Sequence, residues 1–193
     1  SSCLYAAISL NVADHLAGGP KTAAELATAS GANEDALFRV LRLLASLGIF
    51  EETAPRTFAL TAASTLLRKD VPGSLRGMAV FLPDPTHYRI YGNIMESLST
   101  GKPCADTMLG MPVFEYLANN QAYSQVFNDA MTALSAPVAG AAIEAYDFSG
   151  IGTLVDVAGG HGEVLMSILQ ANPTVRGILA DIGHVVDGAK PRI

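Results

Sequence analysis

The chain has 193 residues, half of them hydrophobic and 16% charged, and 12 Lys and Arg against 18 Asp and Glu give a net charge of −6. This composition excludes an intrinsically disordered chain, and the length is that of one large domain, or of one small domain plus part of another. The negative charge argues against a nucleic acid, and no apolar run reaches the roughly 18 residues of a membrane-spanning helix, so we expect neither DNA nor a membrane as a partner.

The first 60 residues predict three helices and two short strands. Apolar side chains repeat with helical spacing through residues 4–16, which predicts one continuous first helix. A capping box that begins at Thr22 predicts a second helix, and Asn33 predicts the start of a third. Strands are expected at residues 49–52 and 57–60. Three helices followed by a hairpin are typical of a winged helix-turn-helix.

The rest of the chain falls into two parts of different pattern. Residues 72–146 are almost wholly helical in character and are broken by proline-containing turns, so we expect two or three connecting helices. Strand, helix and strand patterns follow and predict a βαβ unit, the opening of a doubly wound parallel sheet. We therefore expect a winged-helix domain over residues 1–100, a helical connector over 101–146, and an incomplete α/β domain over 147–193.

The strongest functional signal is a glycine-rich turn between the first strand of that unit, over 153–158, and its helix. Residues with little or no side chain let a ligand approach the backbone at a helix N-terminus. Asp181 ends the next strand, about 20 residues further on, where an acid can accept hydrogen bonds from ribose hydroxyls. Leu165 stands where a dinucleotide site has its last glycine, which disfavours NAD and FAD. The alternative is a glycine-rich turn that binds no ligand.

The turn, from Asp156 to Gly162, resembles the S-adenosylmethionine motif of class I methyltransferases. Together with residues 180–186 it resembles the small-molecule O-methyltransferases of the caffeic acid, carminomycin and hydroxyneurosporene type. Further likeness lies in residues 10–16, 58–61, 91–93, 110–117 and 127–131. The resemblance implies a winged-helix dimerisation domain, a Rossmann-like methyltransferase domain, and methyl transfer from S-adenosylmethionine to a hydroxyl of a small aromatic or polyketide-like compound. Two positions depart from the family, with Ala158 in place of the usual Gly and Gly183 in place of the usual Pro.

The resemblance also implies which residues form the site. Phe127, Met131 and Ser135 are spaced by four residues each, so they lie along one helix face. By resemblance, Phe127 and Met131 border the substrate pocket and Ser135 lies near the methionine end of the cofactor, whereas without it a core role is the simpler interpretation. The expected cofactor-binding residues are Asp156, Ala158, Gly159, Gly160, Gly162, Asp181 and Ser135.

We expect no catalytic residue within this chain. The family uses a histidine general base, none of the four histidines fits that role, and the base is expected beyond Ile193. The chain is therefore expected to be the N-terminal portion of a longer enzyme and to be inactive alone. No cluster of Cys, His or carboxylates has metal-ligand spacing, so we expect no metal. The two cysteines, Cys3 and Cys104, are too few for a disulfide framework and favour a cytoplasmic protein.

Two alternatives remain open. A family member that binds S-adenosylmethionine without transferring its methyl group is one, because the methyl of Ala158 is expected to crowd the cofactor. A winged-helix DNA-binding regulator is the other, although its recognition helix, over 34–47, has only Arg39 and Arg42 against two acids. That helix carries more apolar side chains than a small domain can bury, which indicates a protein partner and predicts a homodimer through the N-terminal domain.

Overall fold

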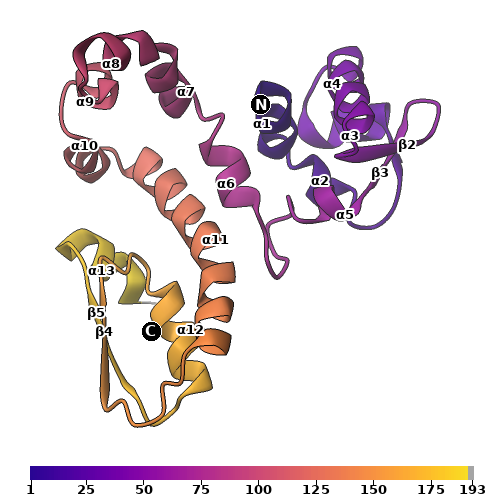
Figure 1. Cartoon of the computed structure of the whole chain (residues 1–193). Helices are drawn as coiled ribbons and strands as arrows, with labels where there is room; N and C mark the ends of the chain where they lie inside the picture. Colours follow the sequence, from indigo (N-terminus) through magenta and orange to yellow (C-terminus); the bar gives the residue numbers. More distant parts are fainter. Residues whose placement is uncertain (191–193) are drawn as a thin grey trace. The chain divides into compact units, whose positions relative to one another are not determined.

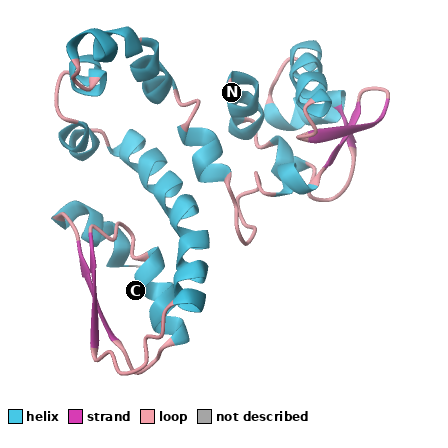
Figure 2. Cartoon of the chain, viewed as in Figure 1, coloured by secondary structure: helices cyan, strands magenta, loops and turns pink. Residues whose placement is uncertain are grey.

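A computed structural model describes residues 1–190 of the chain. These residues are mostly helical and form two small sheets. Figure 1 labels the elements in chain order, and Figure 2 separates helices, strands and loops by colour. The chain forms two compact units, the first from Ser1 to Lys102 and the second starting at Pro103.

The first unit packs its helices around a three-stranded antiparallel sheet. The strand order is β1-β3-β2, and β2 pairs with β3 as a hairpin in which Phe50 lies opposite Leu60. Phe50 and Phe58 from this hairpin are fully buried with Leu41 in a single core. The elements are α1 (Ser2–Ser9), α2 (Val12–His15), β1 (Lys21–Thr22), α3 (Ala23–Ser30), α4 (Glu34–Ser46), β2 (Phe50–Ala54), β3 (Thr57–Leu60), α5 (Ala62–Thr65), α6 (Arg76–Phe81), α7 (Pro85–Gly92) and α8 (Ile94–Thr100).

The first predicted helix is in fact two helices, so the expectation of one helix over 4–16 is wrong. Asn11 adopts a left-handed conformation with φ of 53° and separates α1 from α2. The guanidinium of Arg76 donates hydrogen bonds to Ile8 O at 3.0 Å and to Asn11 Oδ1 at 2.9 Å, and so satisfies backbone and side-chain oxygens at the break. Val12 and Leu16 still point into the core, which is why the apolar period continues across the break.

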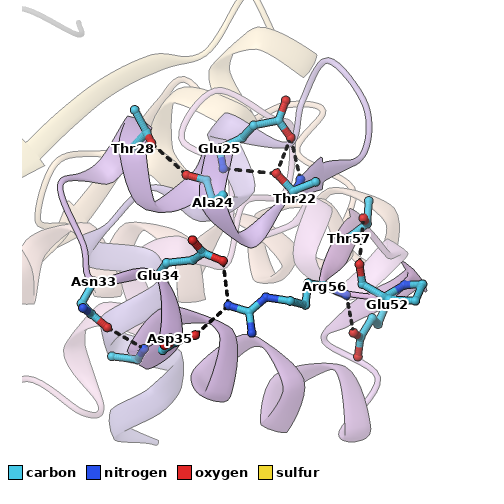
Figure 3. A network of polar contacts seen from close by, with 12 residues as sticks. Thr22, Ala24, Glu25, Thr28, Asn33, Glu34, Asp35, Glu52, Arg56 and Thr57 are labelled. Atoms are coloured by element: carbon cyan, nitrogen blue, oxygen red, sulfur yellow. Dashed lines mark hydrogen bonds and ion pairs between the residues drawn. The ribbon is translucent and has the colours of Figure 1, made fainter.

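The helix starts predicted from capping residues are confirmed. Thr22 and Glu25 form the full capping box of α3, and Asn33 Oδ1 accepts the Ala36 amide at the start of α4, at 3.0 Å (Figure 3). Arg56, in the β2–β3 turn, pairs with Glu34 at 2.7 Å and Asp35 at 2.9 Å (Figure 3). Its guanidinium also lies over the Phe38 ring, 4.3 Å from the centroid. These contacts join the turn of the hairpin to the first turns of α4.

The region between residues 72 and 146 contains six helices, so the expectation of two or three is wrong. Three of them, α6 to α8, belong to the first unit. The additional breaks come from Asn93 between α7 and α8, from the left-handed Gly110 between α9 and α10, and from Asn120 between α10 and α11. Pro137 lies inside α11 without ending it.

The second unit places helices on one face of a two-stranded parallel sheet. β4 and β5 pair in register, with Val155 opposite Ile178, which confirms the predicted strand–helix–strand pattern. α12 packs on both strands and along α11 (Figure 1). A Cβ atom at Gly177 would lie 2.5 Å from Leu169 Cδ1, so this glycine lets α12 approach β5 closely. The elements are α9 (Cys104–Leu109), α10 (Val113–Asn119), α11 (Gln121–Ala145), β4 (Thr153–Val157), α12 (Glu163–Ala171), β5 (Arg176–Ala180) and α13 (Gly183–Ala189).

Candidate functional site

A cavity of about 620 Å³ lies within the second unit, where the carboxyl ends of β4 and β5 meet the face of α11. Cavities of this size hold small ligands and cofactors, and the carboxyl edge of a parallel sheet is where α/β proteins bind them. The wall is formed by Phe114, Leu117, Ser124, Phe127, Asn128, Met131, Thr132, Ser135, Ala158, Gly159, Gly160, His161, Glu163, Val164, Asp181, Ile182 and Val185.

The structure brings most of the sequence-predicted site residues to this one cavity. Its wall includes Phe127, Met131, Ser135, Ala158, Gly159, Gly160 and Asp181. Two further candidates lie outside the wall. Asp156 is on β4 beneath the turn, and Gly162 is the N-cap residue of α12, with φ of 79°.

The turn after β4 is built from unusual backbone conformations. Ala158 and Gly160 both have φ of 58°, in the left-handed region that favours glycine. An L-residue there costs roughly 1–2 kcal/mol relative to its usual conformations, so Ala158 is strained where Gly160 is not. The amide of Ala158 donates to Ala180 O at 2.8 Å, which fixes the start of the turn to β5.

The carboxyl group of Asp156 lies directly under the turn. A Cβ atom at Gly159 would lie 2.5 Å from Asp156 Cγ and from Leu179 Cδ1, so the missing side chain at 159 makes room for this carboxyl. Asp156 Oδ2 is buried and has no hydrogen-bond partner among the residues that the structure describes. Burial raises the pKa of Asp156, the Leu165 backbone amide opposes that shift, and the charge of Asp181 adds to it. Ionisation of Asp156 is therefore less favourable in the folded state than in the unfolded chain.

Asp181 is held by two backbone amides at the edge of the cavity. Its Oδ2 accepts the Gly160 amide at 2.8 Å, and its Oδ1 accepts the Ile182 amide at 2.7 Å. A carboxylate has about four acceptor positions, so both oxygens keep capacity for ligand hydroxyls. The carboxylate is thus fixed in place and still able to bind a ribose.

The far wall of the cavity is apolar and aromatic. The rings of Phe114, from α10, and Phe127, from α11, meet edge to face with centroids 6.5 Å apart. Met131 continues this wall along α11, and Ser135 follows one turn further on. Such a surface suits a flat ring, because edge-to-face contacts and a polarisable thioether both favour aromatic partners.

Several wall residues were not singled out from the sequence. Phe114 lies in one of the segments that resemble the family. The resemblance of a whole segment does not show which of its side chains faces a ligand. Asn128 and Thr132 directly follow Phe127 and Met131 on α11. The face of α11 that lines the cavity is therefore wider than the single row of residues predicted from the sequence. Glu163 directly follows the last glycine of the turn. His161 lies within the turn, and the structure places it in the wall with only 9% of its surface exposed.

The charges of the wall favour some ligands over others. Glu163 and Asp181 bring two carboxylates, and within residues 1–190 no Lys or Arg lines the cavity. A nucleoside or a cation is therefore a better match than a phosphate ester. Across the same part of the chain, no three His, Cys, Asp or Glu side chains gather as metal ligands would.

Asp156→Asn is expected to stabilise the second unit at neutral pH. The folded state raises the pKa of Asp156 above its ordinary value of 3.8, so the folded chain favours the protonated form, and stability is lost as the pH rises through the raised pKa. Asparagine mimics the protonated form, so the variant should gain roughly 1–3 °C in Tm at pH 7 and nothing below pH 3.8.

Thermal unfolding between pH 3 and pH 8 measures this effect, and Asp147→Asn is the matched control. Hydrogen bonds from the backbone and side chain of Ser149 lower the pKa of Asp147, so its ionised form is the one stabilised on folding and its substitution should act with the opposite sign above pH 4. A lower Tm for Asp156→Asn at pH 7 would contradict the interpretation of Asp156 as an acid whose buried Oδ2 lacks a hydrogen-bond partner among the described residues.

Comparison with protein families matches nearly the whole chain in two parts. Residues 1–70 match the O-methyltransferase dimerisation domain, and residues 91–193 match the O-methyltransferase domain. The chain is 38% identical over 190 residues to "Phenazine O-methyltransferase PhzM" of Lysobacter antibioticus, covering 98% of this chain and 55% of the relative. It therefore spans about half the length of the curated relatives it matches.

Solved structures show the same likeness. A crystal structure of LaPhzM superimposes with a TM-score of 0.94 at 38% identity, over 99% of this chain and 57% of the other. The O-methyltransferase NcsB1 from neocarzinostatin biosynthesis superimposes with a TM-score of 0.76 at 30% identity, over 99% of this chain and 59% of the other. That structure is a complex with S-adenosylmethionine and 2-hydroxy-5-methyl naphthoic acid.

Proposed function

The chain belongs to the S-adenosylmethionine-dependent small-molecule O-methyltransferases, and from this we propose that its second unit serves methyl transfer from S-adenosylmethionine to a hydroxyl of a small aromatic or polyketide-like compound. The observation that carries the proposal is one cavity shared by the glycine turn, the Asp181 carboxylate and the aromatic face of α11. S-adenosylmethionine is the cofactor of this family, and the residues present fit it.

The cofactor end of the cavity is formed by the turn and by Asp181. We assign Asp181 to the ribose hydroxyls, the backbone of Ala158, Gly159 and Gly160 to the inner wall, and Ser135 to the methionine end. Bound S-adenosylmethionine supplies a methyl group on a positively charged sulfur. Glu163 and Asp181 make the surrounding potential negative, which favours that charge, and within residues 1–190 no Lys or Arg lines the cavity.

The acceptor end is formed by Phe114, Phe127 and Met131. Their role is to hold a flat ring so that its hydroxyl oxygen faces the methyl group, and to exclude water. Alignment of the two reactants accounts for much of the rate enhancement in such a displacement. The histidine base that the resemblance implies, expected beyond Ile193, lies outside the described residues.

Phe127→Ala tests this division of the cavity. The substitution removes the edge-to-face partner of Phe114, so the affinity of the S-adenosylhomocysteine complex for naphthols should fall about tenfold. S-adenosylhomocysteine itself should bind within about twofold of the unsubstituted protein. Calorimetric titration of the two ligands in turn measures both values. Phe148→Ala, outside the cavity wall, is the control, and equal losses for both ligands would contradict the assignment.

A second candidate function is supported by one observation at Ala158. Its left-handed backbone is strained and it belongs to the cavity wall, so its methyl group occupies space that a glycine leaves open. A protein that binds the cofactor without transferring the methyl for this reason would show calorimetric binding of S-adenosylmethionine but no labelled ether from a panel of phenols, and Ala158→Gly would restore the ether. A DNA-binding role has no comparable support, because the Arg56 guanidinium at the tip of the hairpin is paired with Glu34 and Asp35 and is not available to a phosphate.

For the fold, we propose a winged-helix dimerisation domain over residues 1–100, a connector over 101–146 and the opening of a doubly wound, Rossmann-like domain over 147–193. The antiparallel hairpin of β2 and β3 directly after α4 supports the first assignment. The parallel pair of β4 and β5, with α12 between them in the chain, supports the last.

We propose a homodimer formed through the first unit. The sequence predicts surplus apolar surface on the helix over 34–47, and Leu43 of α4 and Leu47, which directly follows α4, are indeed exposed. Most exposed large apolar side chains of the unit, however, lie in the segment that runs from the start of α6 to the end of α8. They are Leu75, Leu82, Tyr88, Tyr91, Ile94, Met95 and Leu98. Obligate interfaces bury upwards of about 2,000 Å² and are mainly apolar, which suits this surface.

Light scattering should return twice the chain mass of 20.1 kDa at micromolar concentration. The double variant Met95→Asp, Leu98→Asp should shift the protein to the monomer, because it places charges on side chains that are 69% and 72% exposed. Leu134→Asp, on an exposed position of α11 in the second unit, is the control and should stay dimeric. A monomer mass for the unsubstituted protein would contradict the proposal.

We place the protein in the cytoplasm, with no membrane partner. α11 is long and apolar enough to cross a membrane by length and composition, with a mean hydropathy of 1.2 in its most apolar window, but such a helix alone is weak evidence. α11 packs along α12 and supplies residues to the cavity, so we assign it to the site.

A further inference from the structure

Asp181 contacts the glycine turn as well as its own strand. The hydrogen bond from the Gly160 amide to Asp181 Oδ2, at 2.8 Å, joins residues 21 positions apart. Two residues before Gly160, the amide of Ala158 donates to Ala180 O at 2.8 Å. The turn is therefore tied to the end of β5 twice, once through the backbone and once through the Asp181 side chain.

The turn needs such a restraint, because Ala158 is strained and the two residues after it are glycines. Ala158 and Gly160 are both left-handed, and a non-glycine residue there persists only where surrounding contacts impose it. Glycine has more backbone freedom than any other residue type, so Gly159 and Gly160 add conformational freedom to this segment. A hydrogen bond to a carboxylate is among the stronger ones, which suits Asp181 to restrain it.

We propose that Asp181 is a positioning residue for the glycine turn, holding the Gly160 peptide so that the wall formed by 158–160 exists before a ligand enters. This rests on the proposed function, which assigns Asp181 to the ribose. The two roles are compatible, because each carboxylate oxygen uses one acceptor position for an amide and keeps another. A ligand then meets a formed wall and does not have to order three residues on binding.

The two roles are separated by a ligand without ribose hydroxyls. If Asp181 serves the ribose alone, Asp181→Ala weakens S-adenosylhomocysteine and leaves its 2′,3′-dideoxy analogue unaffected. If Asp181 also positions the turn, the dideoxy analogue is weakened as well, by about fivefold or more, and S-adenosylhomocysteine by more than the analogue. Calorimetry with both ligands makes this comparison. Affinity for the analogue within twofold of the unsubstituted protein would overturn the proposal.

Hydrogen exchange of the Gly160 amide gives a readout that needs no ligand. In the ligand-free protein, Asp181→Ala should speed exchange of this amide about tenfold or more, because its acceptor is lost. Asp181→Asn keeps the volume and one acceptor oxygen and should give an intermediate rate. Asp187→Ala is the matched control, an exposed acid of α13 that pairs with Lys190 at 2.7 Å, and should leave the Gly160 amide unchanged.

The outcomes distinguish this inference from the proposed function. If the unsubstituted protein binds neither ligand, the proposed cofactor is wrong, and the exchange rate at Gly160 still decides whether Asp181 holds the turn. If Asp181→Ala fails to fold, Asp181→Asn provides both measurements. Exchange at Gly160 that is unchanged in Asp181→Asn and in every folded Asp181 variant would overturn the positioning role.

Discussion

Replacing Gly159 with alanine is expected to unfold the turn and abolish most cofactor binding. The new Cβ would lie 2.5 Å from three atoms, Cγ and Oδ2 of Asp156 and Cδ1 of Leu179, so the Asp156 carboxyl would have to leave its place beneath the turn. Overpacking of this kind costs about 2 kcal/mol, a loss in Tm of roughly 10 °C for a unit of this size. Affinity for S-adenosylhomocysteine should fall at least about tenfold, because the turn forms part of the cavity wall and is displaced.

Gly183→Ala is the control for this substitution. Gly183 begins α13 with an ordinary φ, and nothing lies within 4 Å of an added Cβ, so neither stability nor affinity should fall. Differential scanning calorimetry and ligand titration of the two variants provide the comparison. Equal behaviour of Gly159→Ala and Gly183→Ala would show that the turn accommodates a side chain at 159.

Gly177→Val is expected to destabilise the second unit by about 2–3 kcal/mol, through the packing of α12 on β5. A Cβ at this position already lies 2.5 Å from Leu169 Cδ1 and 3.3 Å from Leu165 Cδ1, and valine adds two methyl groups beyond it. Leu165 is only 4% exposed, so it has little room to move away from the added methyl groups. α12 must then move away from β5, and the glycine turn at its start moves with it.

Gly152→Val places the same side chain where an added Cβ meets nothing within 4 Å and where φ is ordinary. Chemical denaturation of both variants should show a large loss for Gly177→Val and little change for Gly152→Val. If the two midpoints agree, close approach of α12 to β5 does not limit the stability of this unit.

Features that depend on neighbouring residues were predictable from the sequence. The capping box of Thr22 and Glu25 is confirmed because its partners are only three positions apart. The parallel pairing of β4 and β5 is confirmed because a short apolar strand, a turn, a helix and a second strand in that order leave little choice of topology. Most of the residues expected at the ligand site line one cavity, and those of the turn and of the end of β5 do so because both lie at the same edge of the sheet.

Features that depend on distant residues were not predictable. The break between α1 and α2 is held by Arg76, 65 positions from Asn11, while the apolar period runs straight through it. The bond between Gly160 and Asp181 fixes a backbone conformation that no local pattern encodes. Phe114 reaches the cavity only because α10 packs against α11, so its role follows from tertiary structure alone.

The central claim, that the cavity of the second unit binds S-adenosylmethionine or its product, is tested most directly by a titration followed through backbone amide resonances. S-adenosylhomocysteine should saturate one site and shift the amides of Ser135, Gly160 and Asp181, which come from three different segments of the cavity wall. ADP at the same concentration should leave them in place, because two carboxylates and no Lys or Arg line the described cavity. Unshifted amides at saturating S-adenosylhomocysteine, or equal shifts with ADP, would contradict the claim.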